Sequence, residues 1–350
     1  MTKNMLVTGG CGFIGSNFIR YLLEYSDFAG QIINVDSLTY AGNPENLTDI
    51  ASKFPDRYLF EKEDICNFKG MKKIFDDNQI DMVCHFAAES HVDRSIVKPD
   101  AFIQANIIGS FNLLELARTH QDRIEVFHHV STDEVFGSLG ESGFFTEETP
   151  YKPNSPYSAS KASSDHLVRA YSKTYGLPVN ISNCSNNYGP YQFPEKLIPL
   201  IILNALEGEP LPVYGDGLNI RDWLFVKDHC KAVWRIMKCG KRGETYNIGG
   251  KNEIKNIHLV ENICDLLDET VDKLPNQSRK SLITFVSDRP GHDRRYAIDF
   301  TKIKQELGWE PEETFDSGIE KTIQWYIANK KWVSKVKSGE YRSWIKEHYE

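Results

Sequence analysis

Two side chains of this sequence, Tyr157 and Lys161, have the types and the spacing needed to move a proton. Their i,i+4 spacing places the phenol and the ammonium on the same face of a helix. A lysine charge within roughly 4–6 Å favours the phenolate, so we predict that Lys161 lowers the pKa of Tyr157 from its reference value of about 10. Tyr157 would then be a usable base near neutral pH. An ordinary pair on a helix surface is the alternative interpretation.

The same Tyr-x-x-x-Lys spacing occurs twice more, so the surroundings of each pair have to decide which pair is catalytic. Tyr58 begins an expected strand, and Tyr326 is expected on a C-terminal helix with no link to the edge of the sheet where a ligand would bind. Tyr157 instead follows Pro156, and proline is favoured at the first position of a helix. We therefore expect the chemistry at Tyr157.

A glycine-rich turn separates the first expected strand, residues 5–7, from the helix that follows it. Gly9, Gly12 and Gly15 fit the form G-x-x-G-x-x-G, and Gly10 in place of Gly9 fits G-x-G-x-x-G. The missing Cβ atoms let the backbone approach a pyrophosphate, and free N–H groups at the helix start attract the anion. Glycine-rich turns are common, but the strand before this one and the helix after it indicate a dinucleotide-binding unit.

Asp36 ends the next apolar run, residues 31–35, at the distance expected for a carboxylate that binds the adenosine ribose. Ser37, Leu38 and Thr39 follow it, and none of them is an arginine. A 2′-phosphate would meet the carboxylate without a compensating charge. The sequence therefore favours NAD over NADP.

Strand-like runs at 57–60, 82–86 and 124–130 alternate with helical segments at 65–78 and 100–120. The alternation predicts an α/β fold, a doubly wound parallel sheet of the Rossmann type that is covered by helices on both faces.

Ligands bind beyond the carboxyl ends of the strands in such a sheet. The strand ends carry Asp64 and Ile65, residues 86–90 and residues 131–134. We expect Asp64 at the adenine amino group and the small residues after Phe86 beside the nicotinamide. For each segment taken alone, an ordinary strand end is the alternative.

The composition changes after residue 187, where proline and glycine punctuate short elements and a strand is expected at 221–226. We predict a Rossmann domain with the catalytic residues at 1–187. Residues 188–350 are expected to form mainly a smaller, irregular substrate lobe, with some segments returning to the first domain. The lobe carries basic residues that could hold an anionic substrate: Lys196, Arg221, Arg289 and Arg294.

The chain has 350 residues, enough for one large or two modest domains, and its formal net charge is −8. This charge argues against a general nucleic-acid surface, so we expect no nucleic-acid partner. No long apolar run or signal peptide is visible at the N-terminus, and we expect a cytoplasmic protein without a membrane partner. The seven cysteines are scattered and never spaced C-x-x-C, which suits reduced thiols and predicts no metal site.

With the glycine turn, the Ser131-Thr132 strand end and the Tyr157/Lys161 pair in this order, the chain resembles the extended short-chain dehydrogenase/reductase family. Within that family it is similar to the branch that dehydrates dTDP-glucose. The similarity extends over essentially the full chain, and its motifs lie at 38–43, 132–137, 185–191 and 288–293. The triplet Thr132-Asp133-Glu134 is its most specific element, because relatives that only epimerise or oxidise a nucleotide sugar lack an adjacent acid and base there.

The resemblance implies a dehydration in which NAD is reduced and then reoxidised. Tyr157 takes the proton of the sugar's 4-hydroxyl while the C4 hydride passes to NAD. Glu134 removes the C5 proton as base, Asp133 protonates the departing 6-hydroxyl as acid, and the hydride returns to C6. Thr132 steadies the oxygen at C4, and Lys161 also holds the nicotinamide ribose. The implied product is dTDP-4-keto-6-deoxyglucose, an intermediate of deoxysugar biosynthesis.

Asp133 and Glu134 can divide the acid and base roles only if their environments separate their pKa values. We expect the burial of Asp133 to keep it protonated. The alternative is that both residues merely cap a loop.

The resemblance also implies which residues contact the two ligands. The expected cofactor contacts are Gly9, Gly12, Phe13, Ile14, Gly15, Asp36, Ser37, Leu38, Thr39, Asp64, Ile65, Phe86, Ala87, Ala88, Ser90, Ala105, Tyr157, Lys161 and Asn187. The expected contacts of the nucleotide sugar are Ser90, Thr132, Asn186, Lys196, Leu197, Pro212, Tyr214, Arg221, Asn256, Asp288, Arg289 and His292. Arg221 and Arg289 are expected at its pyrophosphate.

Two other functions remain open at this stage. A nucleotide-sugar 4-epimerase would share the fold, NAD, the tyrosine and the lysine, but would need no acid beside a base. A non-catalytic NAD-sensing protein could have kept the glycine turn alone. Members of the family are commonly homodimers, so the resemblance implies a homodimer here.

Overall fold

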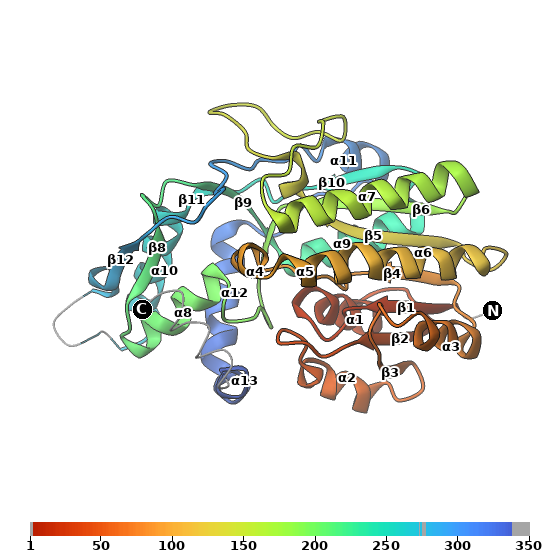
Figure 1. The fold of residues 1–350 in the computed structure, drawn as a ribbon. Helices are drawn as coiled ribbons and strands as arrows, with labels where there is room; N and C mark the ends of the chain where they lie inside the picture. The colour runs from red at the N-terminus through yellow and green to blue at the C-terminus, as the bar shows by residue number, and fades with distance from the viewer. Residues whose placement is uncertain (1–2, 273, 275–277, 338–350) are drawn as a thin grey trace.

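A seven-stranded parallel sheet forms the centre of the molecule (Figure 1). The computed structural model describes residues 3–272, 274 and 278–337, so residues 338–350 of the expected second lobe lie outside the described part. The strand order is β10-β6-β5-β4-β1-β2-β3. The bounds are β1 (Asn4–Thr8), β2 (Gln31–Asp36), β3 (Tyr58–Lys62), β4 (Met82–His85), β5 (Val126–Thr132), β6 (Val179–Cys184) and β10 (Thr245–Ile248).

Helices cover both faces of the sheet, as predicted for a doubly wound fold. The two apolar faces are set by the alternation along each strand, since Leu6 of β1 joins one core cluster while Met5 and Val7 join the other. The Leu6 face packs against α3 (Phe68–Asn78), α6 (Ser110–Thr119) and α7 (Pro156–Tyr175). The opposite face packs against α1 (Phe13–Tyr25), α2 (Thr48–Lys53), α9 (Val226–Cys239) and α11 (Thr301–Leu307).

A second group of elements lies beside one end of the sheet, opposite the N-terminus of the chain (Figure 1). Its strands form a three-stranded sheet, β11-β9-β7, and a two-stranded sheet, β12-β8. Their bounds are β7 (Asn186–Tyr188), β8 (Leu211–Tyr214), β9 (Ile220–Phe225), β11 (Glu253–Lys255) and β12 (Ile283–Val286). A separate apolar core joins them to α8 (Leu197–Glu207), α10 (Asn256–Thr270), α12 (Phe315–Ala328) and α13 (Lys330–Val336).

The second half of the chain also contributes to the central sheet. β10 pairs with β6 and forms the edge of the seven-stranded sheet. Helix α9 packs against α1 and joins the same core cluster. Segments beyond residue 187 therefore help to build the Rossmann sheet.

The predicted single helix at 100–120 is interrupted. The chain forms α4 (Val92–Val97), α5 (Pro99–Phe102), a seven-residue π-helix, η2 (Ile103–Gly109), and then α6. In the π-helix, Asn106 is buried and bonds the backbone N–H and C=O of Glu89 with its side chain. The prediction was wrong about one continuous α-helix because apolar periodicity over twenty residues does not report a local change of hydrogen-bond pattern.

Within the described residues, no helix is long and apolar enough to cross a membrane. The short 3₁₀ segments are η1 (Pro44–Leu47), η3 (Asp133–Phe136) and η4 (Arg279–Leu282).

Candidate active site

The glycine turn between β1 and α1 leaves no space for a side chain at Gly9 or at Gly15. Gly9 has φ +71°, and a Cβ atom there would lie 2.6 Å from the backbone nitrogen of Ala87. A Cβ atom on Gly15 would lie 2.3 Å from the carbonyl oxygen of Gly9. The turn therefore needs glycine at both positions, and it brings the backbone to the N-terminus of α1, where N–H groups are free to meet an anion.

Asp36 ends β2 beside this turn. Its Oδ2 accepts a hydrogen bond from the backbone N–H of Cys11 at 2.9 Å, and its Oδ1 accepts one from the N–H of Leu38 at 2.8 Å. Burial raises the pKa of the Asp36 carboxyl, while these two backbone bonds act in the opposite direction. The bonds fix the orientation of the carboxylate, and its remaining lone pairs can accept from ribose hydroxyls.

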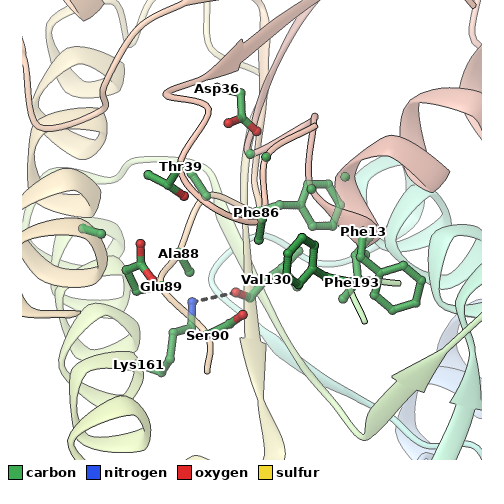
Figure 2. Close-up of a pocket in the computed structure, with 18 of the residues that line it drawn as sticks. Phe13, Asp36, Thr39, Phe86, Ala88, Glu89, Ser90, Val130, Lys161 and Phe193 are labelled. Carbon is green, nitrogen blue, oxygen red and sulfur yellow. Dashed lines mark hydrogen bonds between the residues drawn. The ribbon is translucent and has the colours of Figure 1, made fainter. Parts of the chain in front are cut away.

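A cavity of about 510 Å³ opens at the carboxyl ends of β1 to β5, where the sequence placed the ligands. Figure 2 shows Phe13, Phe86 and Phe193 on one side of it and Ala88 and Glu89 on the other. The predicted residues that line it are Gly9, Gly12, Phe13, Ile14, Gly15, Asp36, Ser37, Thr39, Asp64, Ile65, Phe86, Ala87, Ala88, Ser90, Ala105, Thr132, Glu134, Tyr157, Lys161, Asn186, Asn187 and Lys196.

These residues fit NAD. The glycine turn offers a close backbone approach, the fixed carboxylate of Asp36 stands at the neighbouring strand end, and the cavity has the volume of a small-molecule site. The side-chain oxygens of Asn186 and Asn187 are buried without a hydrogen-bond partner, so each can still accept a bond from a ligand.

Helix α7 carries Tyr157 in its first turn and Lys161 one turn later. The helix begins with a complete capping box between Ser155 and Ser158 and has Pro156 at its first position, as the sequence suggested. Lys161 is 4% exposed, and its Nζ donates to the carbonyl oxygen of Val130 on β5 at 2.8 Å (Figure 2). Helix α7 is therefore tied to the central sheet.

The predicted lowering of the pKa of Tyr157 by Lys161 was wrong. Burial raises this pKa well above its ordinary value, and the charge of Glu134 raises it further. Lys161 itself is buried, and burial lowers the pKa of its ammonium. The sequence could show the i,i+4 spacing but not the desolvation of both groups or the carboxylate that faces the phenol.

Asp133 and Glu134 follow the buried end of β5 within η3. Asp133 is 2% exposed, its Oδ2 has no hydrogen-bond partner, and its Oδ1 accepts a bond from the Thr132 hydroxyl at 3.3 Å. Burial, with the charge of Glu134, raises the pKa of Asp133 well above its ordinary value. The neutral acid is favoured there because an ionised carboxylate would be buried with too few donors.

Glu134 is only partly buried and lines the cavity. Burial raises its pKa, but the charges of Arg289, Arg221 and Lys196 act against that shift. The two neighbouring carboxyls thus lie in different surroundings, one enclosed and one facing the cavity beside cations. This is the asymmetry that an acid and a base next to each other require.

Several predicted residues lie outside the lining of this cavity: Leu38, Asp133, Leu197, Pro212, Tyr214, Arg221, Asn256, Asp288, Arg289 and His292. Leu38 and Asp133 are immediate neighbours of lining residues. The others come from the second group of elements, on α8, β8, β9, α10 and the loop that follows β12.

Some of these residues from the second group of elements lie together around Asp93 of α4. The Tyr214 hydroxyl donates to Asp93 Oδ2 at 3.2 Å, and Arg289 Nη1 donates to Asp93 Oδ1 at 3.3 Å. The Tyr214 and His292 rings lie 6.1 Å apart, and His292 Nδ1 lies 2.6 Å from Asp288 Oδ1.

Arg221 is 4% exposed and lies on β9. Its Nη2 donates to the carbonyl oxygen of Asp293 at 2.9 Å, and its guanidinium carbon lies 4.2 Å from the centre of the Tyr296 ring. A buried guanidinium held by backbone and ring contacts keeps donor capacity for an anion. The roles of these residues with a substrate stay predictions.

Some residues of the site were missing from the sequence prediction. Glu63 and Cys66 line the cavity beside Asp64, and the rule that ligands gather at strand ends would have included them. Gln192 and Glu195 line it from the irregular stretch after β7, where no motif or periodicity marks them.

Comparisons with known proteins agree with this geometry. The family model described as GDP-mannose 4,6 dehydratase matches residues 6–322. The dTDP-glucose 4,6-dehydratase 1 of Escherichia coli (strain K12) is 57% identical over 362 aligned residues, which cover 99% of each chain.

Two solved structures are also similar. The dTDP-glucose 4,6-dehydratase of Bacillus anthracis in complex with NAD is 49% identical, with a TM-score of 0.85, and the match covers 96% of this chain and 100% of that one. The dTDP-glucose 4,6-dehydratase DesIV of Streptomyces venezuelae, also with NAD bound, is 44% identical with a TM-score of 0.89 over 95% of this chain and 100% of that one. With identity this high over nearly the full length, the chain belongs to the dTDP-glucose 4,6-dehydratase family of extended short-chain dehydrogenases/reductases.

Proposed function

We propose that this protein is an NAD-dependent hydro-lyase that converts dTDP-glucose to dTDP-4-keto-6-deoxyglucose. The observation that carries the proposal is the adjacent pair Asp133 and Glu134, one enclosed and one facing the cavity that Tyr157 also lines. The full-length similarity to dTDP-glucose 4,6-dehydratases supports the same function.

NAD, when bound, supplies the acceptor and later the donor of a hydride. The chain's own residues move the protons. Tyr157 takes the proton of the 4-hydroxyl, Thr132 holds the oxygen at C4, and Lys161 keeps α7 fixed against β5 through its bond to Val130.

Oxidation at C4 makes the proton at C5 acidic, and the two carboxyls then act in turn. Glu134 faces the cavity and is the group that can remove this proton as base. Asp133 is kept neutral by burial, so it has a proton to give to the departing 6-hydroxyl as water leaves. The cations that oppose the pKa shift of Glu134 keep that carboxyl available as a base.

A Glu134→Gln variant tests the division of roles. It should still oxidise C4, so reduced nicotinamide should accumulate with dTDP-glucose and its absorbance should rise. The rate of formation of the 4-keto-6-deoxy product should fall by about 10²- to 10⁴-fold. Glu125→Gln, at an exposed surface pair with Lys3, is the matched control and should behave as wild type. Unchanged product formation by Glu134→Gln would count against the proposal.

The same assay separates the two alternatives. A 4-epimerase would convert dTDP-glucose to its galactose isomer, without loss of water. A non-catalytic NAD-sensing protein would bind NAD and turn over no sugar. Mass spectrometry over dTDP-, UDP-, CDP- and GDP-glucose would identify the product and the preferred base together.

We further propose that the protein is a cytoplasmic homodimer with the domain division near residue 187. An apolar surface that extends from α4 through η2 to α6 supports the dimer. Five large apolar side chains there are 38–66% exposed: Ile96, Val97, Ile103, Ile108 and Phe111. Soluble monomers rarely expose apolar side chains in such density. A second copy of this chain is the partner that the family resemblance implies.

Light scattering after gel filtration tests the dimer. Wild type should have twice the mass of the chain, and Phe111→Asp should shift it toward the monomer. Phe285→Asp, at a similarly exposed phenylalanine on β12, is the control and should stay dimeric. A monomeric wild type would overturn this part of the proposal.

A further inference from the structure

The carbonyl of Cys11, inside the glycine turn, is held from outside the turn. Its oxygen accepts hydrogen bonds from the backbone N–H of Asn43 at 3.0 Å and from the side-chain Nδ2 of Asn46 at 2.9 Å. The N–H of Cys11 is the one that donates to Asp36. The peptide units on both sides of Cys11 are therefore fixed by the segment that follows β2.

Asn46 connects the Cys11 carbonyl to the C-terminal part of the chain. Its side chain is 1% exposed, and its Oδ1 accepts a hydrogen bond from the indole Nε1 of Trp332 at 2.7 Å. The amide of Asn46 donates to the Cys11 carbonyl with its nitrogen and accepts from the indole with its oxygen, so the two bonds together determine how the amide is oriented. The backbone oxygen of Asn46 also accepts from Arg20 of α1.

Trp332 lies on α13 and is itself held in an aromatic cluster. Its ring centre is 5.0 Å from that of Trp325, 6.0 Å from that of Tyr191 and 6.4 Å from that of Tyr326. It is 8% exposed. The indole N–H is therefore presented to Asn46 from a rigid, buried position.

The same cluster reaches the cavity at a second point. The Tyr326 hydroxyl donates to the backbone oxygen of Gln192, which lines the cavity, and Gln192 Nε2 donates to the backbone oxygen of Asn187 at 3.0 Å. The expectation that Tyr326 has no link to the ligand-binding edge was therefore wrong. Helix α13 is thus linked to the glycine turn through Asn46, and α12 is bonded directly to the lining residue Gln192.

We propose that α12 and α13 hold the dinucleotide cradle in its NAD-binding shape, with Trp332 as a positioning residue that acts through Asn46 on the Cys11 peptide. The inference rests on the proposed use of NAD. It concerns the affinity for NAD and not the proton-transfer steps, because neither residue lines the cavity.

The test compares two tryptophan variants. Trp332→Phe keeps an aromatic ring in the cluster but leaves the buried Asn46 Oδ1 without its donor, and it should weaken binding of NAD⁺ by roughly 3- to 30-fold. Trp309→Phe is the matched control, since Trp309 is also buried and its Nε1 has no hydrogen-bond partner. Calorimetric titration of each variant with NAD⁺ and with dTDP gives both affinities.

If Trp332 had only a structural role, Trp332→Phe should lower the unfolding temperature and weaken the binding of NAD⁺ and of dTDP alike. If Trp332 is a positioning residue, Trp332→Phe should weaken the binding of NAD⁺ and leave the affinity for dTDP within about twofold of wild type. If Trp332→Phe does not fold, Asn46→Asp replaces it, because it keeps an acceptor for the indole but puts an oxygen against the Cys11 carbonyl. Equal NAD⁺ affinity in Trp332→Phe and Trp309→Phe would overturn the inference.

A double-mutant cycle tests the route through Asn46. If Trp332 acts through that side chain, Trp332→Phe should change NAD⁺ affinity by less than about twofold when Asn46 is already alanine. If the effects of the two substitutions on NAD⁺ affinity are fully additive, Trp332 does not act through Asn46, and this part of the inference is overturned. Failure of the proposed function would look different, because wild type itself would then bind no NAD⁺ or leave dTDP-glucose unchanged.

Discussion

Tyr157, Asp133 and Glu134 show how much the chemistry of a side chain depends on its neighbours. All three are acids whose pKa values are raised, and burial is the first cause in each case. In the mechanism that we propose, the shift leaves Asp133 with the proton that the elimination needs. For Tyr157 the same shift opposes its work as a base, and the charge of Glu134 adds to it.

Removal of the Glu134 charge should therefore make Tyr157 a better base. Because a nearby negative charge disfavours the phenolate, Glu134→Gln should lower the pKa of Tyr157 and move the rising limb of the pH–rate profile for C4 oxidation to lower pH. The initial rate of nicotinamide reduction, followed from neutral to alkaline pH, measures this shift. Asp133→Asn should move the limb less, because burial keeps Asp133 neutral and its replacement removes no charge. A limb that stays in place or moves to higher pH in Glu134→Gln would contradict the account.

At the scale of elements, helix α7 carries two of the residues that we propose to be catalytic and holds them against the end of β5. Tyr157, Lys161 and Asp165 follow one another at intervals of one turn, and Asp165 is fully buried. Its Oδ2 accepts bonds from Ser131 at 2.8 Å and from Tyr151 at 3.0 Å, so it joins the helix to the end of β5. The charge of Asp165 also raises the pKa of Lys161 against the effect of burial.

Asp165→Asn should weaken both functions of this residue. The loss of a buried charge next to Lys161 should lower the free energy of unfolding by about 3–5 kcal/mol. It should also lower the pKa of Lys161, so that activity falls at a lower alkaline pH than in wild type. Asp77→Asn, at an exposed position on α3, is the control and should change neither quantity. Denaturant titration and the pH–rate profile check the two effects; an unshifted alkaline limb would show that Asp165 acts on stability alone.

At the scale of the whole molecule, the two halves of the chain share one core. Helix α9 comes from the second half and packs under the sheet, with His229 fully buried and neither ring nitrogen hydrogen-bonded. His128 of β5 is also fully buried, and its Nε2 lies 3.0 Å from the Ser182 hydroxyl. Burial lowers the pKa of each to about 3.

These two histidines should make the fold sensitive to acid. The unfolded chain takes up their protons near the ordinary pKa of about 6.5, whereas the folded chain does so only near 3. Stability from this source is therefore full above about pH 6.5 and is lost as the pH falls toward 3, by roughly 2 kcal/mol per histidine at about pH 5.

His229→Leu should remove one of the two contributions. Denaturant unfolding at about pH 7 and about pH 5 should then show a difference smaller by roughly 2 kcal/mol than in wild type. His166→Leu, at an exposed position on α7, is the control and should keep the wild-type difference. An unchanged pH dependence in His229→Leu would mean that this side chain is hydrated or protonated in the folded protein.

Local features of the site could be predicted because their physical causes are local. The positions of Gly9 and Gly15 follow from the space that a Cβ atom would need, and the start of α7 follows from Pro156. Contacts between distant segments could not be predicted in this way. Nothing in the sequence pairs Asp93 with Arg289, or Asn46 with Trp332, because loop closure over such separations leaves no local pattern.

The sequence by itself determined the alternation of strands and helices, the glycine turn, the acid at the end of β2 and the neighbouring carboxyls at the end of β5. Each of these depends on residue types within a few positions of one another. Only the tertiary structure decided that α13 bonds Asn46 and α12 bonds Gln192, and that burial raises the pKa of Tyr157 instead of Lys161 lowering it. The physical reason is that desolvation and long-range packing depend on which distant segments surround a group, and the residues next to it in the chain do not contain that information.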